Sequence, residues 1–223
     1  MLKIEHTEVV GWSAAIRGMR NPKNSWAKSD SQTCTNCNGC LPGQECELYK
    51  NGTFIGPNDL DLMTRLRNAG TDHRKFMRMI IVYLDITAPL YYWKEFDTYK
   101  VGTVANSCST MHKIADKEFT LEDFSCEHLE NSWLAHLKET IRLLNEARDA
   151  YNWCNTDAKK EWWWQMIQLL PSSYNQRRTV MLNYEVLANM YKSRRNHKLD
   201  EWHTFCEWIE SLPYSELITG RGD

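Results

Sequence analysis

Four cysteines lie close together in the sequence, and thiolates at such spacing bind zinc or iron. Cys34, Cys37, Cys40 and Cys46 form a C-x2-C-x2-C-x5-C arrangement. Short turns between such residues bring their sulfurs within bonding distance of one tetrahedral ion, so the spacing predicts a zinc site. The two spacings between the first three cysteines also match those of cysteines that hold iron–sulfur clusters, although the last is longer, and that group is the other candidate. The alternative is a loop of free thiols, because no second C-x2-C pair accompanies the four.

A further cysteine, Cys108, lies in the small and polar stretch VGTVANSCSTM at 101–111. Such a composition is typical of backbone that approaches a ligand closely. A thiolate is a strong nucleophile when its pKa is lowered, so we predict Cys108 as the catalytic residue. The alternative is a small side chain that fills a buried gap, because the sequence identifies no partner base for it.

The length, composition and net charge of the chain limit which classes of protein it can belong to. The chain has 223 residues, of which 42% are hydrophobic, and this is enough to bury a sizeable core, so we predict one domain over residues 1–223. The formal net charge is −2, which gives no general attraction to nucleic acid or to an anionic membrane. No apolar run is long enough to span a membrane, and the N-terminus lacks the layout of a signal peptide. We therefore expect a cytoplasmic protein without nucleic-acid or membrane partners.

The first half of the chain predicts a loop, a helix, a strand and a second helix. Residues 21–58 lack periodicity and are rich in Asn, Ser, Gly, Pro and Cys, which predicts a Cys-rich loop inserted outside the core. A helix is expected from Asn58, as its cap, to Gly70, as its stop. Residues 76–86 are apolar and predict a buried strand, and Pro89 suits the first turn of the next helix.

Helical spacing dominates the last third of the chain. Apolar residues recur at helical intervals over 129–148 and again over 202–212. The tryptophans at 162–164 cannot all face one side of a helix, so we expect one of them to meet another subunit, with a ligand as the alternative. Residues 169–194 read as a short buried segment and then one long helix that ends at Arg194. We predict this stretch to be the floor of a ligand site.

The same stretch resembles the C-terminal signature of the flavin-dependent thymidylate synthases, the ThyX family. A second segment, 88–114, aligns without a gap with the part of the family that contains an Arg-His-Arg-x-x-Ser motif. A weaker similarity covers Ala14, Ala15 and Arg17 near the N-terminus. The residues of the C-terminal stretch that carry the resemblance are Leu170, Pro171, Asn183, Leu187, Asn189 and Arg194.

The resemblance implies an α/β (α+β) fold, in which a twisted sheet is packed with long helices and carries the Cys-rich insertion. It implies FAD as cofactor, a deoxyuridine nucleotide (dUMP) as substrate and self-association as a homotetramer with sites between subunits. Carried over residue by residue, it assigns to the cofactor Asn189, Lys100 and Thr103. It assigns to the substrate Arg194, Asn106 and Ser109. It also puts Cys108 at the position of the family's active-site Ser.

The chain departs from the family where the family places positive charge. Neutral side chains or an acid replace arginines or a histidine at Thr98, Tyr99, Thr110, Ile167 and Glu185. Groups that bind phosphate are thereby lost, since a guanidinium offers a planar fork of donors. We therefore predict altered chemistry on a pyrimidine nucleotide in place of standard dUMP methylation. The alternative is a non-catalytic nucleotide sensor or sequestering protein, and a bacterial or phage genome is the expected source.

Overall fold

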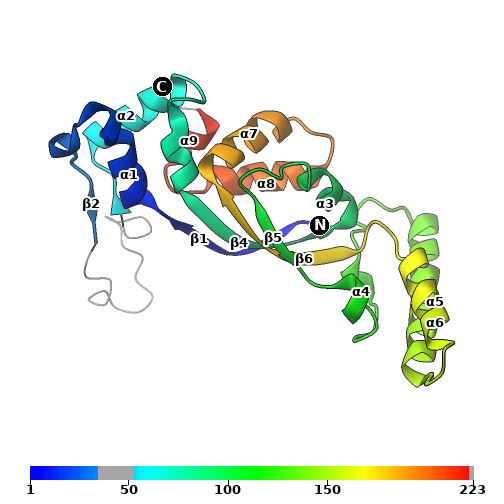
Figure 1. Ribbon diagram of the computed structural model, residues 1–223. Coiled ribbons are helices and arrows are strands. Elements are labelled where there is room, and N and C mark those ends of the chain that lie inside the picture. Colours follow the sequence, from blue (N-terminus) through cyan, green and yellow to red (C-terminus); the bar gives the residue numbers. More distant parts are fainter. Residues whose placement is uncertain (35–52, 221–223) are drawn as a thin grey trace. The chain divides into compact units, whose positions relative to one another are not determined.

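The structure is a computed structural model that describes residues 1–34 and 53–220 (Figure 1). Most of the predicted insertion, including Cys37, Cys40 and Cys46, lies outside the described residues. The strands are β1 (Lys3–Val10), β2 (Gln32–Thr33), β3 (Thr53–Phe54), β4 (Ile81–Pro89), β5 (Val104–Ser107) and β6 (Asn175–Asn183). The α-helices are α1 (Trp12–Arg20), α2 (Pro57–Asn68), α3 (Leu90–Phe96), α4 (Thr110–Lys113), α5 (Asn131–Trp153), α6 (Lys159–Leu169), α7 (Tyr184–Arg194), α8 (Asp200–Glu210) and α9 (Glu216–Thr219). Short 3-10 helices are η1 (Asn21–Lys23), η2 (Trp26–Lys28), η5 (Arg74–Met79) and η6 (Leu121–Asp123).

The chain divides into two compact units, each built from separated segments. The first unit comprises Met1–Ile4, Asp85–Thr98 and Ala105–Thr179. The second unit comprises the described residues of Glu5–Leu84, Tyr99–Val104 and Val180–Asp223. The single domain over 1–223 stays a prediction.

One sheet contains four strands in the order β1-β4-β6-β5, and each of these strands contributes residues to both units. A separate antiparallel pair joins β2 to β3, with Gln32 opposite Phe54 and Thr33 opposite Thr53. Helices account for most of the other regular structure (Figure 1). The prediction of an α/β fold, a sheet packed with helices, is confirmed. Among the described residues no helix is both long and apolar enough to cross a membrane.

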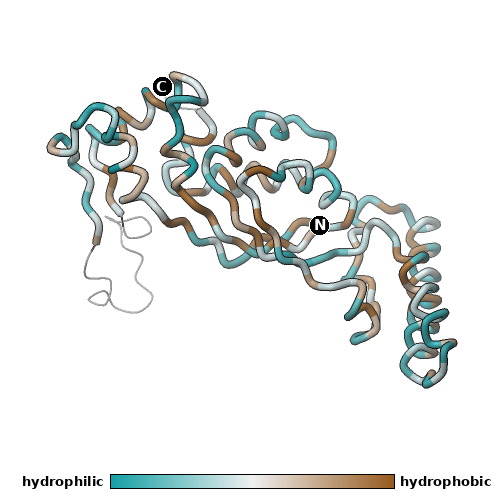
Figure 2. Tube along the Cα trace, viewed as in Figure 1, coloured by the Kyte–Doolittle hydropathy of each residue, from teal (hydrophilic) through white to brown (hydrophobic). Residues whose placement is uncertain are grey.

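In the first unit, α5 and α6 form a helical hairpin joined by residues 154–158. Figure 2 shows hydrophobic residues alternating with hydrophilic ones along both helices, as expected when one stripe packs and the other faces water. The predicted helix over 129–148 is confirmed from Asn131 onward, and Leu129 lies before its first residue. The buried residues that share this core are Ile114, Ala115, Phe119, Phe124, Leu137, Ile141, Leu144, Ala147 and Met166.

Aromatic packing holds the core of the second unit. Trp12 on α1 packs edge-on against Tyr184 and Tyr214, each with 5.2 Å between ring centroids. The Tyr184 hydroxyl donates to the Pro213 carbonyl at 2.6 Å, and burial raises the pKa of Tyr184. A buried ring with a satisfied hydroxyl stabilises a core. Tyr184 is therefore a packing residue.

Residues 169–194 do not form one long helix. The chain ends α6 at Leu169, runs as strand β6 from Asn175 to Asn183 and only then enters α7. Val180 and Leu182 are both buried on one side of the strand, because side chains two apart share a face. The helical prediction was wrong for this part, since Val180 also fits a helical interval measured from α7.

Three smaller expectations are also corrected. Residues 76–86 are part 3-10 helix η5 and part strand β4, so the strand begins only at Ile81. Gly56, and not Asn58, is the N-cap of α2, because Pro57 occupies the first helical position, where its missing N–H costs nothing. Ile55 lies within the loop predicted outside the core, yet it is buried and its amide donates to the Tyr214 hydroxyl at 2.9 Å.

Candidate ligand-binding site

The junction between β6 and α7 is fixed by its own hydrogen bonds. Asn183 has an extended backbone, and its Oδ1 accepts from the Val186 amide at 3.0 Å. An asparagine at this position satisfies an amide that the helix itself cannot pair. The Tyr184 amide donates in turn to the Ile80 carbonyl at 3.1 Å. The first turn of α7 therefore has a defined position in the second unit.

The loop of residues 99–104 lies against this turn. Gly102 has φ of +77°, and a Cβ there would lie 2.8 Å from Asn183 Nδ2 and 3.1 Å from Val186 Cγ2. Only glycine adopts that conformation at so close an approach without strain. The Thr103 hydroxyl is buried and has no hydrogen-bond partner among the described residues. Lys100, predicted to bind the cofactor, is exposed in the same loop.

A cavity of about 420 Å³ lies between this loop, the start of α7, η5 and the turn at Thr71. We call it the α7 cavity. Within the predicted floor at 169–194, the residues from Asn183 onward contribute to it, and Asn189 is the predicted cofactor residue that lines it. The lining residues are Thr71, Arg78, Val101, Gly102, Asn183, Glu185, Val186 and Asn189.

Glu185 anchors two arginines beside the α7 cavity. Its carboxylate accepts from Arg74 Nε at 3.2 Å and forms a short ion pair with Arg78. Burial opposes ionisation of Glu185, but the hydrogen bonds and charges of Arg78 and Arg74 outweigh it, so the pKa of Glu185 is lowered. The same hydrogen bond and charge raise the pKa of Arg78. These shifts favour the charged forms of both Glu185 and Arg78.

Several hydrogen-bond donors line the α7 cavity. Asn189 Oδ1 accepts from Arg74 Nη2 at 3.2 Å, and its amide nitrogen has no partner in the described part of the chain. Asn183 likewise uses its Oδ1 for the helix cap. The Arg78 side chain is 55% exposed, so much of its guanidinium faces outward. Two amide groups and a cation favour a ligand rich in acceptors, such as a phosphate or a ring carbonyl.

Arg194, predicted to bind the substrate, is the last residue of α7. Its Nε donates to the Tyr99 hydroxyl at 2.9 Å, and its guanidinium lies 4.8 Å from the centre of the buried Trp202 ring. Stacking and hydrogen bonding together orient a guanidinium more strictly than a helix terminus alone. The interpretation that Arg194 merely closes the helix therefore leaves out its main contacts.

The other predicted site residues lie in the first unit. Asn106 is exposed on β5, and Ser109 caps α4 by accepting from the His112 amide at 3.0 Å. Cys108 is exposed, so the alternative that it fills a buried gap is wrong. Its backbone is fixed to β6, because its amide donates to the Arg177 carbonyl and its carbonyl accepts from Gln176 Nε2, each at 2.9 Å.

The predicted metal site has one residue in the described part of the chain, Cys34, which is half-buried. Cys37, Cys40 and Cys46 lie outside it. Within residues 1–34 and 53–220, no group of three or more His, Cys, Asp or Glu side chains could hold a metal. Zinc or an iron–sulfur cluster on the four cysteines stays a prediction.

Arg74 and Arg78 were not predicted from the sequence. They precede Glu185 by 111 and 107 residues, so no local spacing connects them. The available signal was an acid at a position where the resemblance implied an arginine. An acid buried beside a ligand site needs a cationic partner, and that requirement could have prompted a search for one.

Comparison with known proteins gives structural relatives only. No family model matches the chain, and no curated protein matches it. A ThyX from Helicobacter pylori, solved with FAD and dUMP, superposes with a TM-score of 0.64 at 14% sequence identity, covering 99% of this chain and 98% of that one. A second structure of a ThyX from Helicobacter pylori, also in complex with FAD and dUMP, gives a TM-score of 0.65 at 14% identity, over 98% of both chains.

A UMP/dUMP methylase, PolB from Streptomyces cacaoi bound with 5-Br dUMP, gives a TM-score of 0.57 at 12% identity, covering 99% of this chain and 95% of that one. Similarity over nearly the whole of each chain at such low identity establishes architecture, whereas chemistry depends on particular side chains. The chain therefore has the fold of the flavin-dependent thymidylate synthases, as the resemblance implied.

Proposed function

We propose that this chain binds a pyrimidine nucleotide and FAD and carries out chemistry on the nucleotide that differs from standard dUMP methylation. The observation that carries the proposal is the Arg78 guanidinium, held by Glu185 at a cavity that Asn189 also lines. Neutral or acidic residues stand in this sequence at several positions where the family has cationic side chains. Arg74 and Arg78 supply guanidinium groups to the same helix from η5 instead, and a guanidinium suits phosphate.

The residues of the second unit fit FAD as an acceptor-rich cofactor. Asn189 and Asn183 offer amide donors, Lys100 offers a cation, and the buried hydroxyl of Thr103 lacks a partner among the described residues. When bound, FAD supplies hydride transfer. Arg78 would bind and orient an anionic group at the rim of the α7 cavity, and the tight approach of Gly102 to Asn183 would keep that wall in place.

We assign the nucleotide to Arg194 of the second unit, while Asn106 and Ser109 of the first unit keep the substrate roles that the resemblance implied as separate expectations. Arg194 is oriented before any ligand binds, which reduces the entropy lost on binding. Cys108 would act as the nucleophile, since its thiol is exposed while its backbone is held on both sides.

We also propose self-association as a homotetramer. Several tryptophans of the helical hairpin in the first unit are exposed, with Trp133 at 63% and Trp153 at 88%. Trp162 and Trp164 are exposed as well, at 41% and 43%. Large aromatic side chains at a surface are enriched in interfaces. Sedimentation of the purified chain tests this, and a monomer at micromolar concentration would contradict it.

The test of the main proposal is to release bound molecules by heat and identify them by mass spectrometry. We expect a flavin, with its visible absorption before release, and a pyrimidine nucleotide. Arg78→Gln should weaken binding of added FAD or dUMP about tenfold or more, because one charge-assisted contact is worth roughly 1.5–3 kcal/mol. Arg17→Gln, on an exposed residue of α1, changes the net charge equally and should leave affinity unchanged. Equal affinity in both variants would contradict the proposal.

A binding protein without catalysis is the second candidate. The observation that favours it is the hydrogen bond from Arg194 to Tyr99, because it engages the arginine within the protein at a position where the family has another residue. A thymidine-requiring strain supplied with this gene should then fail to grow without thymidine. Growth would exclude both this candidate and the proposal of altered chemistry.

A further inference from the structure

A second cavity of the second unit lies beside the end of α1, η1, η2 and the start of α2, with a volume of about 540 Å³. We call it the basic cavity. It shares no lining residue with the α7 cavity. Its walls are Arg20, Lys23, Asn24, Ser25, Lys28, Asn58, Asp61, Leu62 and Arg65.

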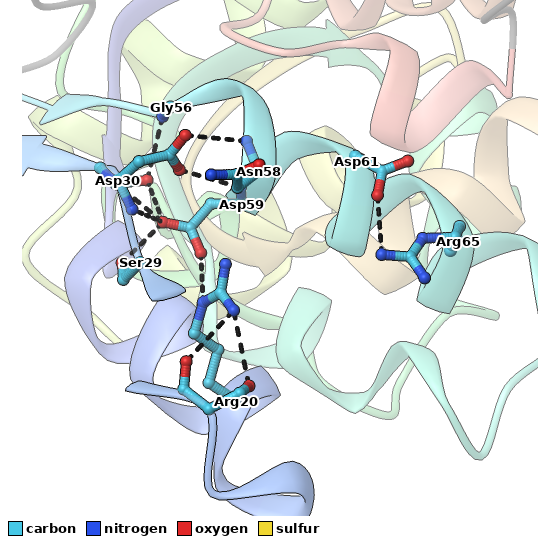
Figure 3. A network of polar contacts seen from close by, with 10 residues as sticks. Arg20, Ser29, Asp30, Gly56, Asn58, Asp59, Asp61 and Arg65 are labelled. Atoms are coloured by element: carbon cyan, nitrogen blue, oxygen red, sulfur yellow. Dashed lines mark hydrogen bonds and ion pairs between the residues drawn. The ribbon is translucent and has the colours of Figure 1, made fainter. Parts of the chain in front are cut away.

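Arg20 is the fixed cation of the basic cavity. It is only 4% exposed, and its Nε donates to Asp59 Oδ1 at 2.6 Å (Figure 3). Its Nη1 donates to the Ser25 carbonyl at 3.2 Å. Asp59 is held by three neighbouring residues that donate to its Oδ2, Ser29, Asp30 and Ser31. The guanidinium is therefore held rigidly at the cavity wall.

Two lysines add charge that nothing described neutralises. Lys23 and Lys28 lie on η1 and η2, and in residues 1–34 and 53–220 neither ammonium has an ion pair or a hydrogen bond. Asp61 is the acid among the lining residues, and it pairs with Arg65 at 2.7 Å (Figure 3). Asp59 offsets Arg20 in the same way. The two lysines are thus a local excess of positive charge on a chain whose net charge is −2.

Neutral donors complete the wall. The Ser25 hydroxyl accepts a long hydrogen bond of 3.4 Å from Arg20 Nη1, so its own hydrogen is available to a ligand. Asn24 and Asn58, whose side chains carry amides, are also among the lining residues. A purely structural role for the Arg20–Asp59 pair, which joins α1 to α2, explains neither the lysines nor the amides. Ammonium, hydroxyl and amide donors around one hollow form the donor set that binds phosphate.

We propose that the basic cavity binds a small phosphorylated anion through Lys23 and Lys28, with Ser25 and Asn58 as neutral donors. Electrostatic attraction of this kind weakens with ionic strength, because both ammonium groups face solvent. The proposal is independent of the function assigned to the α7 cavity.

The test is calorimetric titration of the whole chain with inorganic pyrophosphate at low and at high salt. We expect saturable binding that weakens with added salt. Lys23→Gln/Lys28→Gln should lower the affinity about tenfold or more, equivalent to at least about 1.4 kcal/mol. The matched control is Lys138→Gln/Lys192→Gln, which removes the same charge from exposed positions outside the cavity and should bind as the wild type does.

A third variant, Arg78→Gln, separates the two cavities and should retain pyrophosphate binding. Three outcomes would overturn the proposal. One is the absence of saturable heat, and another is an equal loss in both lysine double variants, which would indicate general charge attraction. The last is a loss confined to Arg78→Gln, which would move the anion to the α7 cavity.

Discussion

Two arginine–carboxylate pairs in the second unit use the same chemistry in opposite settings. In the first, Arg20 and Asp59 have side chains only 5% and 0% exposed. In the second, Glu185 is 8% exposed but its partner Arg78 is 55% exposed. A carboxylate is buried in each pair, so the two pairs differ in how far the arginine side chain is exposed to solvent.

The difference separates a structural pair from a pair that can bind a ligand. Asp59 accepts from Arg20, two serine hydroxyls and two backbone amides, so breaking the pair would leave several donors and a cation buried together. Glu185 accepts from Arg74 as well as from Arg78, so the loss of Arg78 leaves the carboxylate paired. The exposed guanidinium can then interact with a second anion.

The largest expected effect is that of Asp59→Asn. An amide cannot accept at both of its atoms, so its NH₂ group would face donors, and the Arg20 charge would lose its partner. We expect the free energy of unfolding in urea to fall by about 3–5 kcal/mol. Asp61→Asn on the same helix is the control, because its pair with Arg65 is exposed, at 63% and 64%, and should cost less than about 0.5 kcal/mol. Equal losses would remove the distinction between buried and exposed pairs.

The stability that the Asp59 carboxylate contributes should depend on pH. Burial opposes ionisation of Asp59, but its hydrogen bonds from Ser29, Ser31 and Arg20 outweigh this, and its pKa is lowered. A depressed folded-state pKa contributes stability that is present above the unfolded value of about 3.9 and is lost as pH falls through the folded value. The gap in unfolding free energy between wild type and Asp59→Asn should therefore narrow below about pH 4. A gap that does not change with pH would show that Asp59 acts without its charge.

Gly102→Ala should have an intermediate effect. Its φ of +77° disfavours alanine, and the new Cβ would lie 2.8 Å from Asn183 Nδ2. We expect a loss of about 1–3 kcal/mol of stability and weaker ligand binding, because the wall of the α7 cavity must shift. Gly70→Ala is the control, since it shares a positive φ, of +105°, but a Cβ there meets nothing within 4 Å. If the two variants lose the same amount, the contact with Asn183 contributes nothing.

Only part of the fold and of the candidate site could be predicted from the sequence. The helices were predictable where one apolar stripe sufficed, as in α5 and α8. The switch from β6 to α7 was not, because Val180 satisfies both a strand and a helix period and only Asn183 marks the boundary. Asn189 was predicted and lines the α7 cavity, whereas Arg78 depends on a contact across 107 residues that no local pattern encodes.

Arg194 and Arg195 are adjacent cations, and we expect only the first to contribute to nucleotide affinity. We predict that Arg194→Ala weakens nucleotide binding about tenfold and that Arg195→Ala does not, because Arg194 is the residue oriented by Tyr99 and Trp202. Affinity and thermal midpoint should be measured for both variants. Equal affinity with only the midpoint lowered would place the nucleotide elsewhere.

Apart from the controls, the smallest expected effect on stability is that of Arg78→Gln. The side chain is more than half exposed, and Glu185 keeps Arg74 at 3.2 Å, so we expect a loss of no more than about 1 kcal/mol. High salt should shrink that loss further, since an exposed charge is screened. Arg17→Gln, with the same change in net charge, should show no loss. If Arg78→Gln instead unfolded as easily as Asp59→Asn, the second pair would be structural like the first, and the guanidinium assigned to a ligand would already be required by the fold.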